Sequence, residues 1–318
     1  MGEVRGESAP PPQAGAEAEP TEAPFVRRLV PVRDGRMSVL LAGPETGPTL
    51  VFCHATGFNA LTYRTLLAPL ASTVRLVVPD LRGHGLGDLP AVPARLRSWD
   101  TYARDLGALL DALKVERAVL AGHSMGGVTA LLAGAERRER VAGLVLLDPV
   151  ILPRPFYWAQ LLPGAGHLKR SAHPMVTQAA RRRAEFASRE DAVAAYRGRG
   201  AFARWPDEVL ADYVRGGTIP AGAGDADGGK VRLACAPAWE AATFAAHAHY
   251  PWAAIARLRV PATILAAGEG STFPPIVASA VASLRPQWRI ERLDDTRHLF
   301  PMEEPELART LIARALDG

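Results

Sequence analysis

The chain is short of cysteine, and this shortage limits the chemistry open to it. Its 318 residues include only Cys53 and Cys235, too few for a disulfide framework. Neither cysteine belongs to a Cys/His spacing that is typical of zinc. We therefore expect a protein of a reducing compartment, with no bound metal.

Long apolar runs are also missing. The longest candidate, AGLVLLDPVILP, is interrupted by Asp148 and Pro149 and is too short to span a bilayer. The first residues, MGEVRGESAP, lack the apolar core of a signal peptide. We expect a cytoplasmic protein without stable membrane insertion.

Lysine is nearly absent, because only three of the 37 basic residues are lysines. The net charge of +4 and the pI near 9.3 could suggest an anionic partner. However, the arginines alternate with acids, as in AERRER and SREDAVAAYRGR, which is typical of solvated surfaces. We expect a small-molecule substrate and no nucleic-acid partner, and the sequence leaves the oligomeric state open.

The chain divides into a tail, a core and an insertion. Residues 1–24 are rich in Pro, Glu, Ala and Gly and predict a disordered tail. Short apolar runs alternate with helical patterns over residues 25–150 and again over 251–318. This alternation predicts an α/β fold with a mostly parallel central sheet and helices on both faces. Residues 151–250 interrupt it, and we expect them to form an inserted helical cap.

The stretch VLAGHSMGGVTAL carries the strongest chemical signal. Ser124 stands between Gly122 and Gly126, where the apolar run RAVLA changes into a helical pattern. A serine at such a strand-to-helix elbow is exposed above the sheet, and flanking glycines relieve the crowding around it. The stretch predicts a nucleophilic serine, against the plainer interpretation of an ordinary loop.

A serine hydroxyl needs a base within hydrogen-bond reach, and the base needs an acid to orient it. His298 follows the last predicted strand and precedes the last helix, which is the expected place for the base. His54, His84 and His123 lie on loops near the predicted site, where we expect them to shape it without acting as the base.

With these motifs in order, the chain resembles the α/β-hydrolase superfamily. The resemblance rests on FCHATGF, VVPDLRGHGLGD, LAGHSMGG, LLDPV and DTRHLFPMEEPE, and it covers residue 25 to the C-terminus. Within the superfamily, the chain is similar to lid-bearing serine hydrolases of the esterase and lipase type. The resemblance also implies that the turn DLRGHGLGD is structural, and we expect Arg82 and Asp80 to pair locally there.

The triad acid departs from the superfamily pattern. The resemblance places an aspartate in a G-x-x-D turn after the strand ATILAAG, but this chain has Ser271 at that position. Some members take the acid from the end of the preceding strand, which here gives Asp148. Glu269, in the right loop but two residues early, is the alternative. Asp294 and Asp295, close before His298 in the sequence, are weaker candidates for the acid.

The oxyanion donors are also implied by the resemblance. They would be the backbone N–H groups of Thr56 and Met125, with Gly57 or Phe58 as alternatives to Thr56. This chain has HATGF where the superfamily usually has H-G-x-P. Because backbone donors are insensitive to side-chain type, the HATGF loop can still donate to the oxyanion.

The predicted function is hydrolysis of an ester or related acyl bond of a small, largely apolar substrate, with no cofactor. A serine nucleophile argues against haloalkane dehalogenase and epoxide hydrolase chemistry, which the superfamily performs with aspartate at this position. Three alternatives stay open: carbon–carbon bond hydrolysis, acyl transfer, and a non-catalytic ligand-binding relative.

Overall fold

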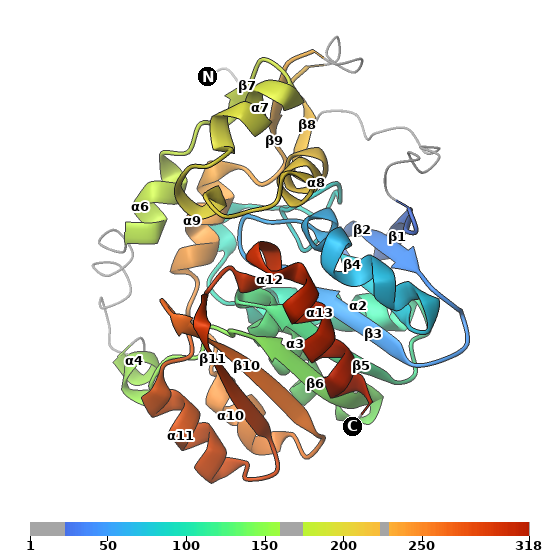
Figure 1. Ribbon diagram of the computed structural model, residues 1–318, viewed down its shortest axis with the longest axis vertical. Helices are drawn as coiled ribbons and strands as arrows, with labels where there is room; N and C mark the ends of the chain where they lie inside the picture. Colours follow the sequence, from blue (N-terminus) through green and yellow to red (C-terminus); the bar gives the residue numbers. More distant parts are fainter. Residues whose placement is uncertain (1–22, 160–173, 223–228, 318) are drawn as a thin grey trace, which may run out of the picture.

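The computed structural model describes residues 23–159, 174–222 and 229–317 (Figure 1). The predicted tail, residues 1–24, therefore lies almost entirely outside the described residues. No helix in the described part of the chain combines the length and the apolar character needed to cross a membrane.

Eight strands form the central sheet, in the order β1-β2-β4-β3-β5-β6-β10-β11. Their bounds are β1 (Val26–Val32), β2 (Gly35–Ala42), β3 (Thr49–Cys53), β4 (Arg75–Pro79), β5 (Ala118–His123), β6 (Val141–Leu147), β10 (Ala262–Glu269) and β11 (Arg289–Arg297). Strand β2 runs antiparallel to both of its neighbours, and every pair from β4 to β11 is parallel. The predicted α/β fold with a mostly parallel sheet is confirmed.

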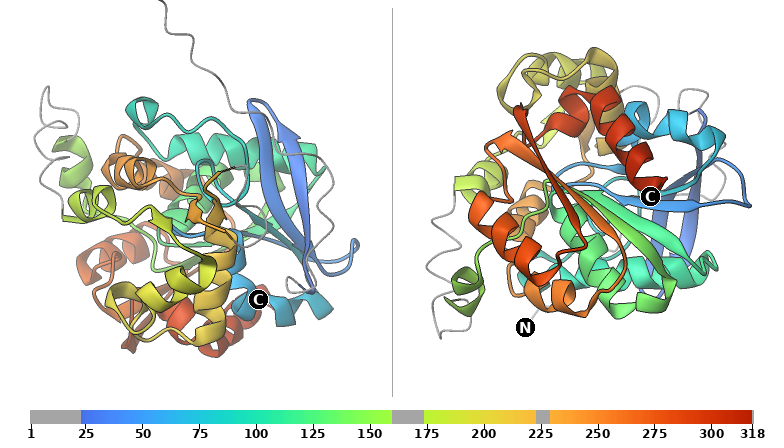
Figure 2. Two further views of the ribbon diagram at one scale, coloured as in Figure 1. Left: turned by 90° about the horizontal axis from the view of Figure 1, so that it is seen from above. Right: turned by 60° about the horizontal axis from the view of Figure 1, so that its bottom comes forward.

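Helices cover both faces of this sheet, as Figures 1 and 2 show. The core helices are α1 (Arg64–Leu67), α2 (Asp100–Ala112), α3 (Met125–Glu136), α10 (Pro251–Arg257), α11 (Pro275–Leu284), α12 (Phe300–Glu303) and α13 (Pro305–Leu316). Side chains of α2, α3, α10 and α11 belong to one buried cluster, and those of α1, α12 and α13 belong to another. Two apolar layers explain why the central strands, such as β3, are buried along their whole length.

In Figure 1, most of the described part of the segment between β6 and α10 lies above the core, whereas residues 154–159 lie near α11 at the lower left. Its described elements are α4 (Arg154–Ala159), α6 (Pro174–Ala180), β7 (Glu185–Phe186), α7 (Arg189–Tyr196), α8 (Asp207–Gly217), β8 (Thr218–Pro220), β9 (Val231–Leu233) and α9 (Pro237–Ala245). The strands form a separate antiparallel sheet in the order β7-β9-β8. The insertion was expected to be helical, and the structure adds this small sheet to its helices. Strands of two or three residues are too short to show an alternating pattern in the sequence. We keep residues 151–250 as the proposed limits of this cap.

Candidate active site

Ser124 occupies a strained elbow between β5 and α3. Its φ of 57° and ψ of −119° lie in a region that L-residues rarely adopt, at a cost of about 1–3 kcal/mol. The flanking glycines are required by close packing. A Cβ on Gly122 would collide with the backbone of Gly126, and a Cβ on Gly126 would collide with the backbone of Cys53. Ser124 N–H donates to the Leu147 carbonyl at 2.9 Å, which fixes the elbow to the end of β6.

The structure brings Ser124, His298 and Asp148 into one line of hydrogen bonds. His298, directly after β11, has Nε2 3.1 Å from Ser124 Oγ. Its Nδ1 lies 2.6 Å from Asp148 Oδ2, directly after β6. Because the carboxyl ends of parallel strands meet at one edge of a sheet, residues far apart in the sequence can converge there.

Asp148 is fully buried and surrounded by donors. Its Oδ1 accepts hydrogen bonds from Ala267 N–H at 3.0 Å and from Ser271 Oγ at 2.5 Å. Its Oδ2 accepts one from Thr272 N–H at 2.9 Å, besides the contact with His298. Burial by itself would raise the pKa of the Asp148 carboxyl, but these hydrogen bonds, above all that of His298, hold its pKa below the ordinary value. Asp148 is therefore ionised at neutral pH.

The alternative acids lie elsewhere. Glu269, Asp294 and Asp295 are exposed, and among the described residues none of them makes a hydrogen bond to His298. Glu269 shares with His298 only the lining of a shallow hollow of about 170 Å³. Of the acids that the sequence left open, Asp148 is the one in contact with the imidazole.

The loop after β3 carries three of the backbone N–H groups that the sequence offers as oxyanion donors, at Thr56, Gly57 and Phe58. Phe58 N–H donates to the Ala55 carbonyl at 3.2 Å, and Gly57 N–H donates to His84 Nε2 at 3.1 Å. Thr56 N–H and Met125 N–H donate to no other atom of the described residues. Met125 is the first residue of α3, where backbone N–H groups have no partner within the helix. Of the candidate donors named from the sequence, Thr56 and Met125 are therefore the two whose N–H groups have no partner among the described residues.

Two buried histidines hold the loops around the site. His54 Nε2 accepts from Leu81 N–H at 2.9 Å, and His84 Nε2 accepts from Gly57 N–H. Because a backbone N–H can only donate, both rings present an unprotonated Nε2. Burial lowers the pKa of His54 and lowers that of His84 to about 3. Both rings are neutral supports, as the sequence indicated.

The predicted local pair of Arg82 and Asp80 is wrong. Arg82 binds Asp105 of α2 at 2.7 Å and Asp34 at 3.2 Å. Asp80 accepts from Arg27 of β1 at 2.9 Å. The turn is structural, but its charges tie it to distant elements instead of to each other.

The cap packs directly on the loop that carries Thr56. Phe58 meets the rings of Trp205 and Tyr213 edge-on, with centroids 5.4 and 5.6 Å apart. Arg182 binds Glu240 at 2.8 Å and donates to Tyr213 Oη at 2.5 Å. These contacts place aromatic side chains and one internally paired charge beside the loop of Thr56.

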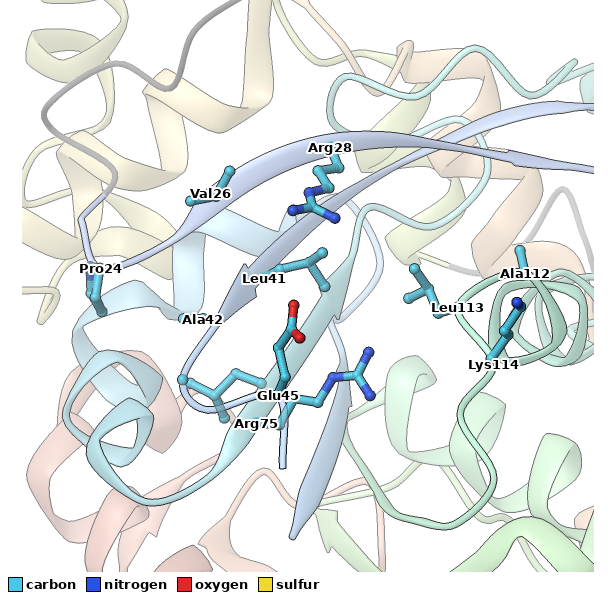
Figure 3. Close-up of a pocket in the computed structure, with 12 residues that line it drawn as sticks. Pro24, Val26, Arg28, Leu41, Ala42, Glu45, Arg75, Ala112, Leu113 and Lys114 are labelled. Carbon is cyan, nitrogen blue, oxygen red and sulfur yellow. The ribbon is translucent and has the colours of Figure 1, made fainter. Parts of the chain in front are cut away.

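Two hollows of the described residues lie apart from the triad. A cleft of about 430 Å³ lies beside β1, β2 and the end of α2, and Figure 3 shows Arg28, Arg75 and Lys114 along it with Glu45 between them. A second, of about 460 Å³, lies beside Arg82. Neither is lined by Ser124, His298 or Asp148.

Metal-binding and thiol chemistry find little support in the described residues. They contain no group of three or more His, Cys, Asp or Glu side chains that could hold a metal ion. Cys53 and Cys235 are free and buried, and burial raises the pKa of Cys53 to about 12. The Cys53 thiol therefore stays protonated and is a poor nucleophile.

Comparison with known proteins identifies the family. The sequence profile of the alpha/beta hydrolase family matches residues 50–309. The chain belongs to this family. The motifs that predicted the fold all lie at the carboxyl edge of its sheet or directly beside it.

Curated relatives within the family differ in their activities. The chain is 32% identical over 148 residues to a haloalkane dehalogenase of Mesorhizobium japonicum, covering 46% of this chain and 44% of the relative. It is 34% identical over 121 residues to 3-oxoadipate enol-lactonase 1 of Acinetobacter baylyi, covering 38% and 44%. The chain thus matches less than half the length of these relatives.

Solved structures match over most of the chain. E-2-(acetamidomethylene)succinate hydrolase superposes with a TM-score of 0.75 at 22% identity, covering 92% of this chain and all of that one. The thioesterase domain from the curacin biosynthetic pathway gives 0.70 at 18% identity, covering 91% and 99%. At these identities the likeness establishes the fold alone.

Proposed function

We propose that this protein is a serine hydrolase that cleaves an ester or related acyl bond through an acyl-enzyme on Ser124. The observation that carries this proposal is the unbroken line of hydrogen bonds from Ser124 Oγ through His298 to Asp148. The amides of Thr56, in the loop after β3, and of Met125, the first residue of α3, have no partner among the described residues.

In the proposed mechanism, Ser124 Oγ attacks the substrate carbonyl while His298 Nε2 accepts the hydroxyl proton. Asp148 stabilises the imidazolium that forms and holds the ring with Nδ1–H directed at itself. The Thr56 and Met125 N–H groups donate to the oxygen that becomes negative. His298 then returns the proton to the leaving group. A water, deprotonated by His298, attacks the ester carbonyl of the acylated serine. His298 then returns this proton to Ser124 Oγ as the acid leaves.

The substrate side of the proposal rests on the cap. Phe58, Trp205 and Tyr213 bring aromatic surface to the loop of the proposed oxyanion donors. The charge of Arg182 is already neutralised by Glu240. A small, largely apolar acyl group fits these surroundings better than a highly charged one.

Serine at position 124 distinguishes this proposal from the chemistry of the dehalogenase relative. A carboxylate that displaces a halide forms an ester, which water can cleave at the carbonyl. A serine that displaced a halide would form an ether, and water could not regenerate the enzyme. Hydrolysis of a lactone, the activity that the other relative is named for, is acyl-bond cleavage and agrees with the proposal.

The proposal is tested by turnover of p-nitrophenyl esters with acyl chains of increasing length. We expect the wild type to hydrolyse them, and Ser124→Ala to be slower by about 10³-fold or more. Ser279→Ala is a matched control, because Ser279 is exposed on α11 and binds only the Pro275 carbonyl. Full activity in the Ser124→Ala variant would refute the proposal.

A further inference from the structure

A second line of buried hydrogen bonds crosses the site behind the triad. Ala55 N–H donates to Tyr63 Oη at 3.2 Å, and Tyr63 Oη lies 2.8 Å from His123 Nδ1. His123 Nε2 in turn lies 2.8 Å from the backbone carbonyl of His298. The line therefore joins the loop of Thr56, the elbow and the loop of the proposed base.

We propose that Tyr63 and His123 are positioning residues, which hold the backbone of His298 and the oxyanion loop in register with Ser124. This inference rests on the proposed function, since it concerns the alignment of the same triad. It gives a role to two side chains that do not belong to the triad.

The ends of the line and a neutral His123 ring together determine the position of every hydrogen in it. Ala55 N–H can only donate, so Tyr63 Oη accepts from it. In a neutral ring with its hydrogen on Nε2, His123 Nδ1 is an acceptor, so Tyr63 donates its own hydrogen to it. The carbonyl of His298 can only accept, so His123 must carry its hydrogen on Nε2. With a neutral ring, one arrangement satisfies all four groups: the Nε2–H tautomer of His123.

Burial makes this arrangement costly to break. Ala55 and Tyr63 are almost fully buried, and His123 is completely buried. Losing one group would leave a buried donor or acceptor without a partner. Burial, reinforced by the nearby His298, lowers the pKa of His123 to about 3, so the ring remains neutral in the working range of a hydrolase.

The line also complements the contact with Asp148. Asp148 orients the imidazole of His298 from Nδ1, while His123 fixes the backbone from which that imidazole extends. The His123 and His298 rings lie 4.9 Å apart. A neutral ring there allows His298 to gain a proton during catalysis without meeting a like charge.

Tyr63→Phe tests the role of the tyrosine oxygen. We expect kcat for a p-nitrophenyl ester to fall about 10- to 100-fold with KM within about twofold, because alignment and not binding is lost. Tyr102→Phe is the matched control. Tyr102 is equally buried, and its hydroxyl binds Thr243 Oγ1 at 2.8 Å, away from the triad. Equal kcat in the two variants would overturn the proposal.

Two substitutions of His123 separate the halves of the line. Gln has a nitrogen at the same number of bonds from Cα as His Nε2, so His123→Gln can keep the donor to the His298 carbonyl. Asn reaches only the position of Nδ1, so His123→Asn keeps the Tyr63 contact alone. We expect His123→Gln to retain at least about tenfold more kcat than His123→Asn. The reverse order, or equal values, would contradict the proposal.

A measurement without substrate distinguishes failure of this inference from failure of the proposed function. Nitrogen-15 NMR of the wild-type imidazoles reports the tautomer of His123 directly. We expect a neutral Nε2–H ring from pH 5 to pH 8. An Nδ1–H tautomer or a charged ring would overturn the inference even in an active enzyme, whereas an inactive wild type with the expected tautomer would count against the hydrolase proposal alone.

Discussion

Ser271 donates a hydrogen bond to Asp148 Oδ1 at 2.5 Å, from the loop position where the resemblance to other hydrolases places the acid itself. In this chain the carboxylate comes from the end of β6, and the hydroxyl at the loop position is its partner. Because Asp148 Oδ2 faces His298 Nδ1 at 2.6 Å, the oxygen that Ser271 binds is the one turned away from the histidine.

Asp148→Asn should lower kcat by about 10³- to 10⁴-fold, because an amide stabilises neither the correct tautomer nor the imidazolium. Glu269→Gln is the control and should stay within about twofold of the wild type, since Glu269 is exposed. Ester hydrolysis measured on both variants decides between the two acids. A fast Asp148→Asn enzyme with a slow Glu269→Gln enzyme would assign the acid to Glu269.

Ser271→Asp in the Asp148→Asn background should recover part of the lost rate, on the order of tenfold or more. The aspartate would extend from a position already in contact with residue 148, and the new amide could donate to it. The comparison is kcat of the double variant against Asp148→Asn. If kcat did not recover in a folded double variant, only an acid at the β6 position could orient His298.

The pH dependence of stability should reveal the charge on Asp148. Its pKa is held below the ordinary value, so the ionised carboxylate stabilises the fold above the unfolded-state pKa. This contribution is lost as the pH falls through the folded-state pKa. The difference in the free energy of unfolding between the wild type and Asp148→Asn should therefore shrink from pH 7 to pH 3 in urea titrations. A difference that grew on acidification would contradict the assigned direction.

Gly57→Ala should damage the oxyanion loop, whereas Thr56→Ala should not. Gly57 has a φ of 77°, and a Cβ there would lie 2.6 Å from Glu240 Oε1. Thr56 is proposed to act through its N–H, which alanine retains. We expect kcat to fall about 10- to 100-fold in Gly57→Ala and to change less than about threefold in Thr56→Ala. A large loss in Thr56→Ala would instead assign a role to its side chain.

The pair of Arg182 and Glu240 should stabilise the contact between cap and loop as a unit. Removing one partner of a buried ion pair typically lowers the free energy of unfolding by about 3–5 kcal/mol. Because Arg182 is partly exposed, we expect a loss of about 2–3 kcal/mol for Glu240→Gln. Removing both charges, in Arg182→Met with Glu240→Gln, should cost less than the sum of the single changes. Additive losses in a double-mutant cycle of unfolding free energies would show that the two groups are uncoupled.

The sequence predicted the features that depend on local pattern. The elbow was predictable because Gly122 and Gly126 are sterically required beside Ser124, and the place of His298 followed from its position after the last strand. The choice of acid depended on packing: Asp148 and Glu269 both follow strands, and only the fold turns one toward the imidazole. The partners of Arg82 were missed for the same reason, since Asp105 comes from a helix that the sequence does not place beside the turn.

The central claim is that Ser124 is a nucleophile activated by His298, and labelling with a fluorophosphonate tests it most directly. Mass spectrometry of the labelled wild type should locate a single adduct on Ser124, and the folded Ser124→Ala variant should carry none. His298→Ala should label at least about 10²-fold more slowly than the wild type. A folded wild type that takes no label, or a Ser124→Ala variant that is labelled as fast as the wild type, would contradict the account.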